Sequence, residues 1–286
     1  MTINSICVCG AGTMGAGIAL VAAQCGFHTV VFDVNKQVQD NAQLNIQRDL
    51  QKLADKGKIS LAEKDNTFNR IQFTSDTNEC IADIIIEAIV ERPEVKIGLF
   101  NQLAELNHSE TIFATNTSSL SVTQIASGVM QPGRVIGMHF FNPAPVMKLV
   151  EIIKAEQTLD TIVRDVYDLA KQLNKTPVLC KDAPGFIVNR VARPYYIESL
   201  RIAEQGETNI ETIDALLQSS GFKMGPFKLM DLIGNDINYA VSCSVYEQMG
   251  KPERLKPSYL QEEKVKAGSL GKKTGAGYYD YKEPAN

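Results

Sequence analysis

The sequence predicts a two-domain α/β protein, with a doubly wound parallel sheet in the first domain and helices alone in the smaller second domain. Short apolar runs alternate with longer amphipathic stretches through the first half of the chain. The pattern changes near Pro184-Gly185, beyond which strand-like runs nearly vanish. The length of 286 residues also fits two domains at about 150 residues each. We therefore expect domains at 1–183 and 184–286.

Seven short apolar runs in the first domain are expected as strands. The runs at Val30-Val31-Phe32 and at 84–86 are continuously apolar, as is typical of parallel strands that are covered on both faces. The expected strands are residues 5–9, 29–33, 83–88, 111–114, 135–139, 149–153 and 177–180.

Amphipathic stretches between these runs are expected as helices, and the strand–helix alternation predicts the doubly wound sheet. In the first domain they cover residues 14–25, 36–56, 93–106, 122–127 and 158–174, and residues 36–64 as a whole form a polar, exposed helical excursion. In the second domain they cover residues 186–205, 210–219, 227–249 and 258–267.

The composition argues against several classes of protein. A net charge of −4 disfavours a nucleic-acid binder, which usually carries a basic excess. The sequence has neither an apolar run of about 18 residues, the length of a membrane span, nor a secretory signal. The six cysteines include no CxxC pair and only three histidines are present. We therefore expect reduced cysteines, no metal site and a cytoplasmic location.

A GxGxxG pattern at Gly10, Gly12 and Gly15 follows the first expected strand and opens a helix, which is the context that a dinucleotide-binding loop requires. Gly10 permits a tight turn, Gly12 lets the backbone approach a pyrophosphate, and Gly15 lets helix and strand pack closely. The free N–H groups at the helix start then face the anion.

Asp33 ends the second expected strand, eighteen residues beyond Gly15. A carboxylate there can accept hydrogen bonds from the adenosine ribose and would repel a 2′-phosphate, so the sequence predicts NAD as the cofactor in preference to NADP. The alternative is a surface aspartate after a buried strand.

His139 and Glu151 lie near the ends of two successive expected strands. An enzyme that removes a hydride from a carbinol must also remove the hydroxyl proton, which is a common task of histidine. A nearby carboxylate can orient the ring and stabilise the imidazolium. The alternatives, a structural histidine and a solvated glutamate, stay open at this point.

A polar segment, Thr115-Asn116-Thr117-Ser118-Ser119, follows another expected strand. It falls at the carboxyl edge where α/β sheets bind ligands. Its hydroxyl and amide groups can hold a nicotinamide or a substrate oxygen, while the alternative is a serine cap for the next helix, from Ser119 or from Ser121 further along.

Together with longer segments, these motifs make the chain resemble the (3S)-3-hydroxyacyl-CoA dehydrogenases, of the short kind that includes bacterial 3-hydroxybutyryl-CoA dehydrogenases. The resemblance runs nearly end to end. The segments that carry it are GAGTMGAGIA at 10–19, EAIVE at 87–91, ATNTSSLS at 114–121, HFFNPAPVMKLVEII at 139–153, KDAPGFIVNR at 181–190, MGPFKLMDLIG at 224–234 and GKKTGAGYYDY at 271–281.

The resemblance implies roles for individual residues. His139 matches the catalytic base and Glu151 the carboxylate paired with it, while Ser118 and Asn189 match the groups that contact the reacting oxygen. Around the cofactor, Asp33 matches the ribose acceptor. The positions that match polar residues near the nicotinamide half are Glu91, Lys96, Asn116 and Asn142.

The resemblance also implies a Rossmann-type NAD-binding domain, an acyl-CoA substrate in the cleft between the domains, and a helical second domain that forms a homodimer interface. It implies a role in fatty acid metabolism, through β-oxidation or butanoate metabolism. Lys52, Lys56 and Lys58 are candidates for the CoA phosphates, with a solvated helical face as the alternative for each. The chain departs from its relatives at Arg92-Pro93 and at Asn235-Asp236.

Two other functions stay open at this point. One is a related dehydrogenase that acts on a free hydroxy acid such as a sugar acid. The other is a dinucleotide sensor without catalysis, which would need neither His139 nor Glu151.

Overall fold

The computed structural model describes residues 2–281 of the chain. Its contacts divide the chain into two compact units, Met1–Ala183 and Pro184–Asn286. The boundary between the two units falls after Ala183.

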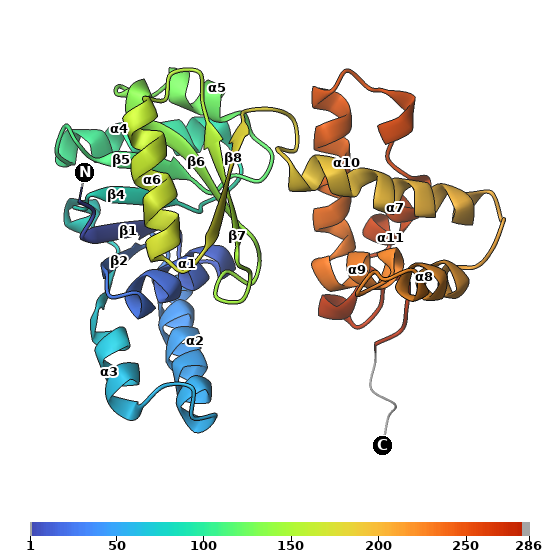
Figure 1. The fold of residues 1–286 in the computed structure, drawn as a ribbon, viewed down its shortest axis with the longest axis horizontal. Helices are drawn as coiled ribbons and strands as arrows, with labels where there is room; N and C mark the ends of the chain where they lie inside the picture. Colours follow the sequence, from blue (N-terminus) through green and yellow to red (C-terminus); the bar gives the residue numbers. More distant parts are fainter. Residues whose placement is uncertain (1, 282–286) are drawn as a thin grey trace. The chain divides into compact units, whose positions relative to one another are not determined.

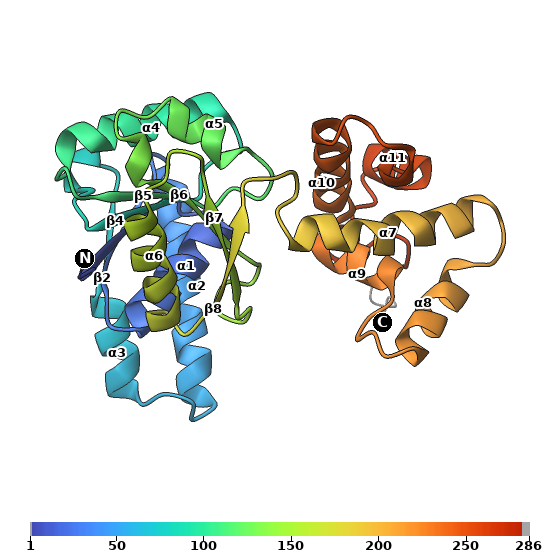
Figure 2. The same cartoon turned by 45° about the horizontal axis from the view of Figure 1, so that its top comes forward.

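The first unit contains an eight-stranded sheet with the order β3-β2-β1-β4-β5-β6-β7-β8. Figures 1 and 2 show this sheet with helices packed against it. All neighbouring strands pair parallel except β6 and β7, which are antiparallel. The strands are β1 (Ser5–Cys9), β2 (His28–Phe32), β3 (Ile71–Thr74), β4 (Ile84–Glu87), β5 (Ile112–Thr115), β6 (Val135–Phe140), β7 (Leu149–Lys154) and β8 (Thr176–Lys181).

Helices cover both faces of this sheet. On one face, apolar side chains of α1 (Thr13–Gln24), α2 (Lys36–Asp55) and α6 (Asp160–Gln172) share a core with inward-facing strand residues such as Ile6 and Ile86. On the other face lie α4 (Pro93–Leu106) and α5 (Val122–Ser127). There the rings of Phe100 and Phe113 lie 5.4 Å apart. The predicted doubly wound sheet is confirmed.

The polar excursion between β2 and β3 consists of two helices, and the first, α2, confirms the helix expected over residues 36–56. α2 ends at Asp55, and α3 (Leu61–Asn69) starts after Ser60. Ser60 and Glu63 form a reciprocal capping box, a serine-to-glutamate spacing that stabilises a helix start. The short edge strand β3 that follows α3 was not predicted, because an apolar–polar alternation over only four residues is too short to stand out in the sequence.

The second unit is helical, as expected. It contains α7 (Val188–Glu204), α8 (Ile210–Ser219), α9 (Pro226–Ile233), α10 (Asn235–Gln248) and α11 (Tyr259–Lys266). The single helix expected over residues 227–249 is wrong. Gly234 separates α9 from α10 with φ +104°, a backbone conformation that interrupts a helix and favours glycine.

Two buried aspartates organise this second unit. The Asp214 carboxylate accepts hydrogen bonds from the backbone N–H groups of Phe227 and Lys228, at 2.9 and 3.0 Å, and so satisfies the start of α9. The Asp231 carboxylate accepts from the backbone N–H groups of Tyr278 and Tyr279, at 2.9 and 3.0 Å. The C-terminal tyrosine segment is therefore fixed to α9.

Candidate active site

The loops after β1, β2, β4, β5 and β6 all leave the sheet at the same edge, because these strands are parallel. The chain order reverses between β1 and β4, where successive connections run to opposite sides. Ligands of open α/β sheets bind beside such a switch point, at the carboxyl ends of the strands. Most of the predicted site residues lie along this edge.

Each of the three glycines in the loop after β1 is glycine for its own physical reason. Gly10 has φ +99°, and a Cβ there would lie 2.6 Å from the carbonyl oxygen of Ala88. A Cβ on Gly15 would lie 1.7 Å from the carbonyl oxygen of Gly10. A Cβ on Gly12, by contrast, would meet no atom within 4 Å, and no side chain caps α1. The fold itself therefore requires Gly10 and Gly15, whereas Gly12 keeps the uncapped helix start open to an anion.

Asp33 lies directly after β2 and next to this loop. Its Oδ2 accepts a hydrogen bond from the backbone N–H of Ala11 at 2.8 Å, and its Oδ1 accepts from that of Asn35 at 2.9 Å. A carboxylate has about four acceptor positions, so both oxygens keep capacity for ribose hydroxyls. The buried Gln39 amide donates to the carbonyl oxygen of Asp33 at 2.5 Å and holds this strand end in place.

A buried ion pair stands at the end of β4. Lys96 on α4 and Glu87 are 1% and 0% exposed, and the Lys96 ammonium donates to Glu87 Oε1 at 2.6 Å. Thr115 Oγ1 donates to the other carboxylate oxygen at 2.8 Å. Burial raises the pKa of Glu87, although Lys96 and the hydrogen bonds oppose that shift. Glu87 was not predicted as a site residue, since its only signal was a carboxylate at the end of an otherwise apolar strand.

Glu91 extends this network to the loop after β5. Its Oε2 lies 3.1 Å from the Lys96 ammonium. Its Oε1 accepts hydrogen bonds from Thr117 Oγ1 at 2.5 Å and from the backbone N–H of Ser118 at 3.1 Å. The structure thus connects three predicted site residues, Glu91, Lys96 and Ser118, through one set of contacts.

Asn116 joins the loop after β5 to the end of β6. Its Oδ1 accepts a hydrogen bond from the backbone N–H of Phe140 at 2.8 Å, and its own backbone N–H donates to the carbonyl oxygen of Glu87 at 2.8 Å. Ser121, not Ser119, caps α5 by accepting from the N–H of Gln124. Ser119 therefore does not cap α5 and remains a member of the polar segment at 115–119.

His139 and Glu151 form a direct side-chain pair. They are cross-strand partners in the register of β6 and β7, and His139 Nδ1 lies 2.8 Å from Glu151 Oε2. The two residues are 5% and 0% exposed. The alternative of a solvated glutamate at a strand end is therefore wrong for Glu151.

Two buried or half-buried charged groups that hold loops of this unit were not found from the sequence. Lys175, buried, donates to the carbonyl oxygens of Ala144 and Met147 at 2.5 and 2.9 Å and so holds the β6–β7 connection. Burial lowers its pKa. The Asp182 carboxylate accepts from Ser121 Oγ at 2.7 Å and fixes the start of α5. A lone lysine and a lone aspartate in polar segments gave no pattern to detect.

Other predicted residues lie outside this network. Asn142 is exposed, two residues beyond β6. Asn189 lies in the first turn of α7 and so belongs to the second unit. Lys52, Lys56 and Lys58 are at and beyond the last turn of α2, and all three are exposed.

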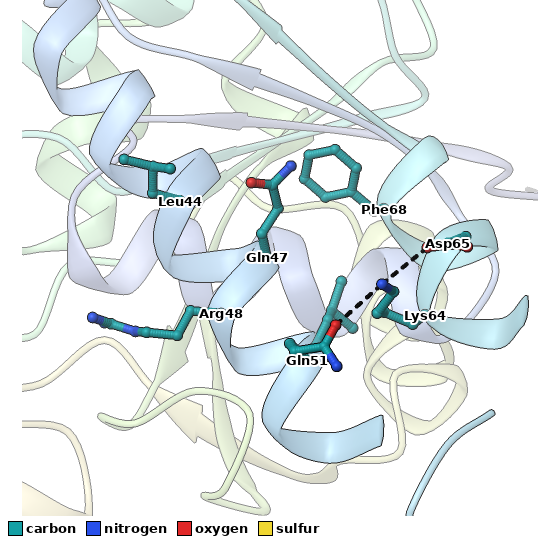
Figure 3. A pocket seen from close by; sticks show the side chains of 8 residues that line it. Leu44, Gln47, Arg48, Gln51, Lys64, Asp65 and Phe68 are labelled. Atoms are coloured by element: carbon teal, nitrogen blue, oxygen red, sulfur yellow. Dashed lines mark hydrogen bonds and ion pairs between the residues drawn. The ribbon is translucent and has the colours of Figure 1, made fainter. Parts of the chain in front are cut away.

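A pocket of about 390 Å³ lies between α2 and α3 (Figure 3). Gln47, Gln51, Lys64 and Phe68 line it, and the Lys64 ammonium donates to Gln51 Oε1 at 3.2 Å. The three lysines expected to bind the CoA phosphates do not line this pocket.

Within residues 2–281, no three His, Cys, Asp or Glu side chains gather in a way that could hold a metal ion. Over the same residues, each helix is too short or too polar to span a membrane.

The family description "3-hydroxyacyl-CoA dehydrogenase, NAD binding domain" matches residues 5–183, and "3-hydroxyacyl-CoA dehydrogenase, C-terminal domain" matches residues 185–281. The chain belongs to the 3-hydroxyacyl-CoA dehydrogenase family. This membership confirms the resemblance drawn from the sequence motifs, and it confirms NAD as the cofactor of the first unit.

Individual relatives of this family align over almost the whole chain. The 3-hydroxyadipyl-CoA dehydrogenase of Escherichia coli (strain K12) is 44% identical over 99% of this chain, which spans only 60% of that relative's length. A probable 3-hydroxybutyryl-CoA dehydrogenase of Bacillus subtilis (strain 168) is 40% identical over 99% of both chains. The crystal structure of (S)-3-hydroxybutyryl-CoA dehydrogenase PaaH1 from Ralstonia eutropha has a TM-score of 0.94, at 36% identity, and the match covers 99% of this chain and 100% of that one.

The residues at the glycine loop of this chain fit NAD. The open backbone at Gly12 and the uncapped start of α1 accept a pyrophosphate, and Asp33 presents a carboxylate at the adjacent strand end. A 2′-phosphate would bring negative charge against that carboxylate, which favours NAD over NADP.

Proposed function

We propose that this chain is an NAD-dependent oxidoreductase that interconverts (3S)-3-hydroxyacyl-CoA and 3-ketoacyl-CoA. The observation that carries the proposal is the buried His139–Glu151 pair, with 2.8 Å between Nδ1 and Oε2, in the sheet that carries the NAD loop. A dehydrogenase needs a proton acceptor beside its hydride acceptor, and an oriented imidazole meets that need.

The proposed chemistry divides between the cofactor and the protein. NAD, when bound, supplies the acceptor for the hydride that leaves C3 of the substrate. The bond from Nδ1 to Glu151 leaves Nε2 of His139 as the ring atom that takes the proton of the 3-hydroxyl group. The Glu151 carboxylate stabilises the imidazolium that forms, because the charges attract in a buried setting.

Ser118 and Asn189 are proposed to donate hydrogen bonds to the substrate oxygen as it changes from hydroxyl to carbonyl. The position of Ser118 is supported by the bond from its backbone N–H to Glu91. Glu91 in turn pairs with the buried Lys96. Asn116 ties the same loop to the end of β6 through Phe140. The polar groups Glu91, Lys96, Asn116 and Asn142 are proposed to surround the nicotinamide half of the cofactor.

The proposal also covers the acyl chain, the assembly, the pathway and the location. A short acyl chain, as in 3-hydroxybutyryl-CoA, follows from the relatives that carry that name. A homodimer through residues 184–286 and roles in β-oxidation and butanoate metabolism follow from the family. A cytoplasmic location is supported by six cysteines that are all free.

Oxidation of NADH, followed by its absorbance in the presence of acetoacetyl-CoA, tests the proposed reaction. NADPH replaces NADH in one control, and free acetoacetate replaces the thioester in another. We expect NADH loss only with the thioester and much slower loss of NADPH. Turnover of free acetoacetate or of sugar acids would favour the hydroxy-acid alternative, and NADH binding without any turnover would favour a sensor.

A further inference from the structure

Glu87, Lys96 and Glu91 form a cluster of charged side chains at the carboxyl end of β4. The Lys96 ammonium lies 2.6 Å from Glu87 Oε1 and 3.1 Å from Glu91 Oε2, so one cation is shared between two carboxylates. Within residues 2–281, no second cation forms an ion pair with either carboxylate. Arg92, which follows Glu91 in the sequence, pairs with Glu94 instead. One negative charge of the cluster therefore has no counter-ion.

The contacts of both carboxylates are those of anions. Besides the Lys96 ammonium, Glu87 accepts hydrogen bonds from the backbone N–H of Ile89 at 2.7 Å and from Thr115 Oγ1 at 2.8 Å. Glu91 Oε1 accepts from a hydroxyl and a backbone N–H of the loop after β5. A protonated carboxyl would need an acceptor for its own hydrogen, and ammonium and backbone N–H groups are donors only. These partners favour the ionised form, although burial opposes it at Glu87 and raises its pKa.

The unbalanced charge is not enclosed in the core. Glu87 and Lys96 are buried, but the side chain of Glu91, in the loop after β4, is 38% exposed. This loop lies at the carboxyl edge of the sheet, where α/β proteins bind their ligands. Glu91 and Lys96 are also among the groups proposed to surround the nicotinamide half of the cofactor. The cluster therefore adds a negative potential to the place proposed for the nicotinamide ring.

The two oxidation states of the cofactor differ in charge at this ring. The nicotinamide of the oxidised form, NAD⁺, is a pyridinium cation, whereas the dihydronicotinamide of NADH is neutral. The pyrophosphate and the adenosine are the same in both forms. An unbalanced carboxylate near the ring attracts the cation and changes the energy of the neutral ring little.

We propose that Glu87 is a specificity-determining residue for the oxidation state of the cofactor. Its buried negative charge raises the affinity of the site for NAD⁺ relative to NADH, above that of a cluster with balanced charges. This inference rests on the proposed function, through the placement of the nicotinamide half beside Glu91 and Lys96. The competing role is a structural clamp, in which Glu87 only holds Lys96 in place.

The test measures the dissociation constants of NAD⁺, NADH and ADP-ribose, which lacks the nicotinamide, by calorimetric titration. Glu87→Gln keeps the shape of the side chain and removes its charge. At about pH 8, where carboxylates are ionised, we expect the ratio of Kd for NAD⁺ to Kd for NADH to rise at least about tenfold in this variant. NADH should bind more weakly by a smaller factor, and ADP-ribose should bind as in the wild type. Glu94→Gln, at an exposed position of α4, should leave the ratio unchanged.

A structural clamp predicts a different result. The two dissociation constants would then rise together in Glu87→Gln, and an unchanged ratio would overturn the proposal. A loss of ADP-ribose affinity equal to the loss for NAD⁺ would also overturn it, because the damage would extend over the whole cofactor site.

Two further measurements keep the test decisive. If Glu87→Gln does not fold, as judged by thermal unfolding, Glu91→Gln removes a charge of the same cluster at a half-exposed position. The same rise in the ratio is expected there, and an unchanged ratio would overturn the proposal. Turnover of acetoacetyl-CoA by the wild type tests the proposed function separately. An inactive wild type with the shifted ratio in its variants would contradict the reaction and support the role of Glu87.

Discussion

His139 and Glu151 face each other across the antiparallel strands β6 and β7, with Nδ1 of the imidazole 2.8 Å from Oε2 of the carboxylate. Direct cross-strand neighbours have their Cβ atoms about 5 Å apart, so the sheet itself brings the two side chains together. Both are buried, and competition from water is therefore small. The orientation of the imidazole is a consequence of strand register rather than of a flexible loop.

Glu151→Gln should slow the reaction while it leaves the cofactor site intact. The amide keeps nearly the same shape but loses the charge that stabilises the imidazolium, so we expect kcat to fall about 10- to 1,000-fold. NADH affinity, measured by fluorescence titration, should stay nearly unchanged. Glu156→Gln, at a position just beyond β7, is the matched control. A kcat near that of the wild type in Glu151→Gln would argue against the pair as catalytic machinery.

Gly12→Ala and Gly15→Ala should separate cofactor binding from stability. The added methyl group at Gly12 meets nothing within 4 Å, so the melting temperature should be unchanged while NADH binds at least about tenfold more weakly, because the methyl group keeps the pyrophosphate from the backbone. At Gly15 it would lie 1.7 Å from the carbonyl oxygen of Gly10, and we expect a loss of about 1–3 kcal/mol in the free energy of unfolding. Unchanged NADH affinity in Gly12→Ala would place the pyrophosphate elsewhere.

Asp33→Ala should weaken the preference for NAD. Removal of the carboxylate takes away an acceptor for the ribose hydroxyls and also the repulsion toward a 2′-phosphate, so we expect the ratio of kcat/KM for NADH to that for NADPH to fall about 10- to 100-fold. Asp40→Asn, on α2 and paired with Lys36, should leave the ratio unchanged. The explanation of cofactor choice fails if Asp33→Ala discriminates as strongly as the wild type.

Glu87→Gln should gain stability, relative to the wild type, as the pH rises. Burial raises the pKa of Glu87 above its ordinary value of 4.5, so the folded state holds this proton more tightly than the unfolded state. The stabilisation is complete below pH 4.5 and is lost as the pH rises through the folded-state pKa. Urea unfolding at about pH 4 and about pH 7, on either side of this window, measures the difference between the two proteins.

The control for this titration is Glu105→Gln, at an exposed position of α4, which should follow the wild type at both pH values. A difference between wild type and Glu87→Gln that is constant with pH, or that moves in the wild type's favour at the higher pH, would contradict the assignment. Separately, loss of the Lys96 ion pair in Glu87→Gln should raise the KM for NADH, because Glu87 holds Lys96 in place.

The sequence was sufficient to predict those parts of the fold that depend on local pattern. The continuously apolar run at 84–86 became the buried strand β4, and the glycine spacing at 10–15 became the turn into α1. The break at Gly234 was missed because apolar residues continue on both sides of it, and a single glycine is tolerated within many helices. Its φ of +104° is visible only in the structure.

The site was predictable only where a residue's role follows from its type. His139 and Glu151 could be proposed as a pair, but their contact depends on the antiparallel register of β6 and β7. Glu87 was missed, because its importance follows from burial and from the identity of its neighbours. Neither property can be derived from a single charged residue in a sequence.

The central claim is that His139 exchanges the substrate proton in a 3-hydroxyacyl-CoA dehydrogenase reaction. The most direct test is NADH oxidation with acetoacetyl-CoA by the wild type and by His139→Ala, measured side by side with NADH affinity. We expect rapid turnover by the wild type, a kcat lower by about 10²- to 10⁴-fold in His139→Ala, and similar NADH affinity in both. Turnover of the variant at a rate close to that of the wild type would contradict the claim.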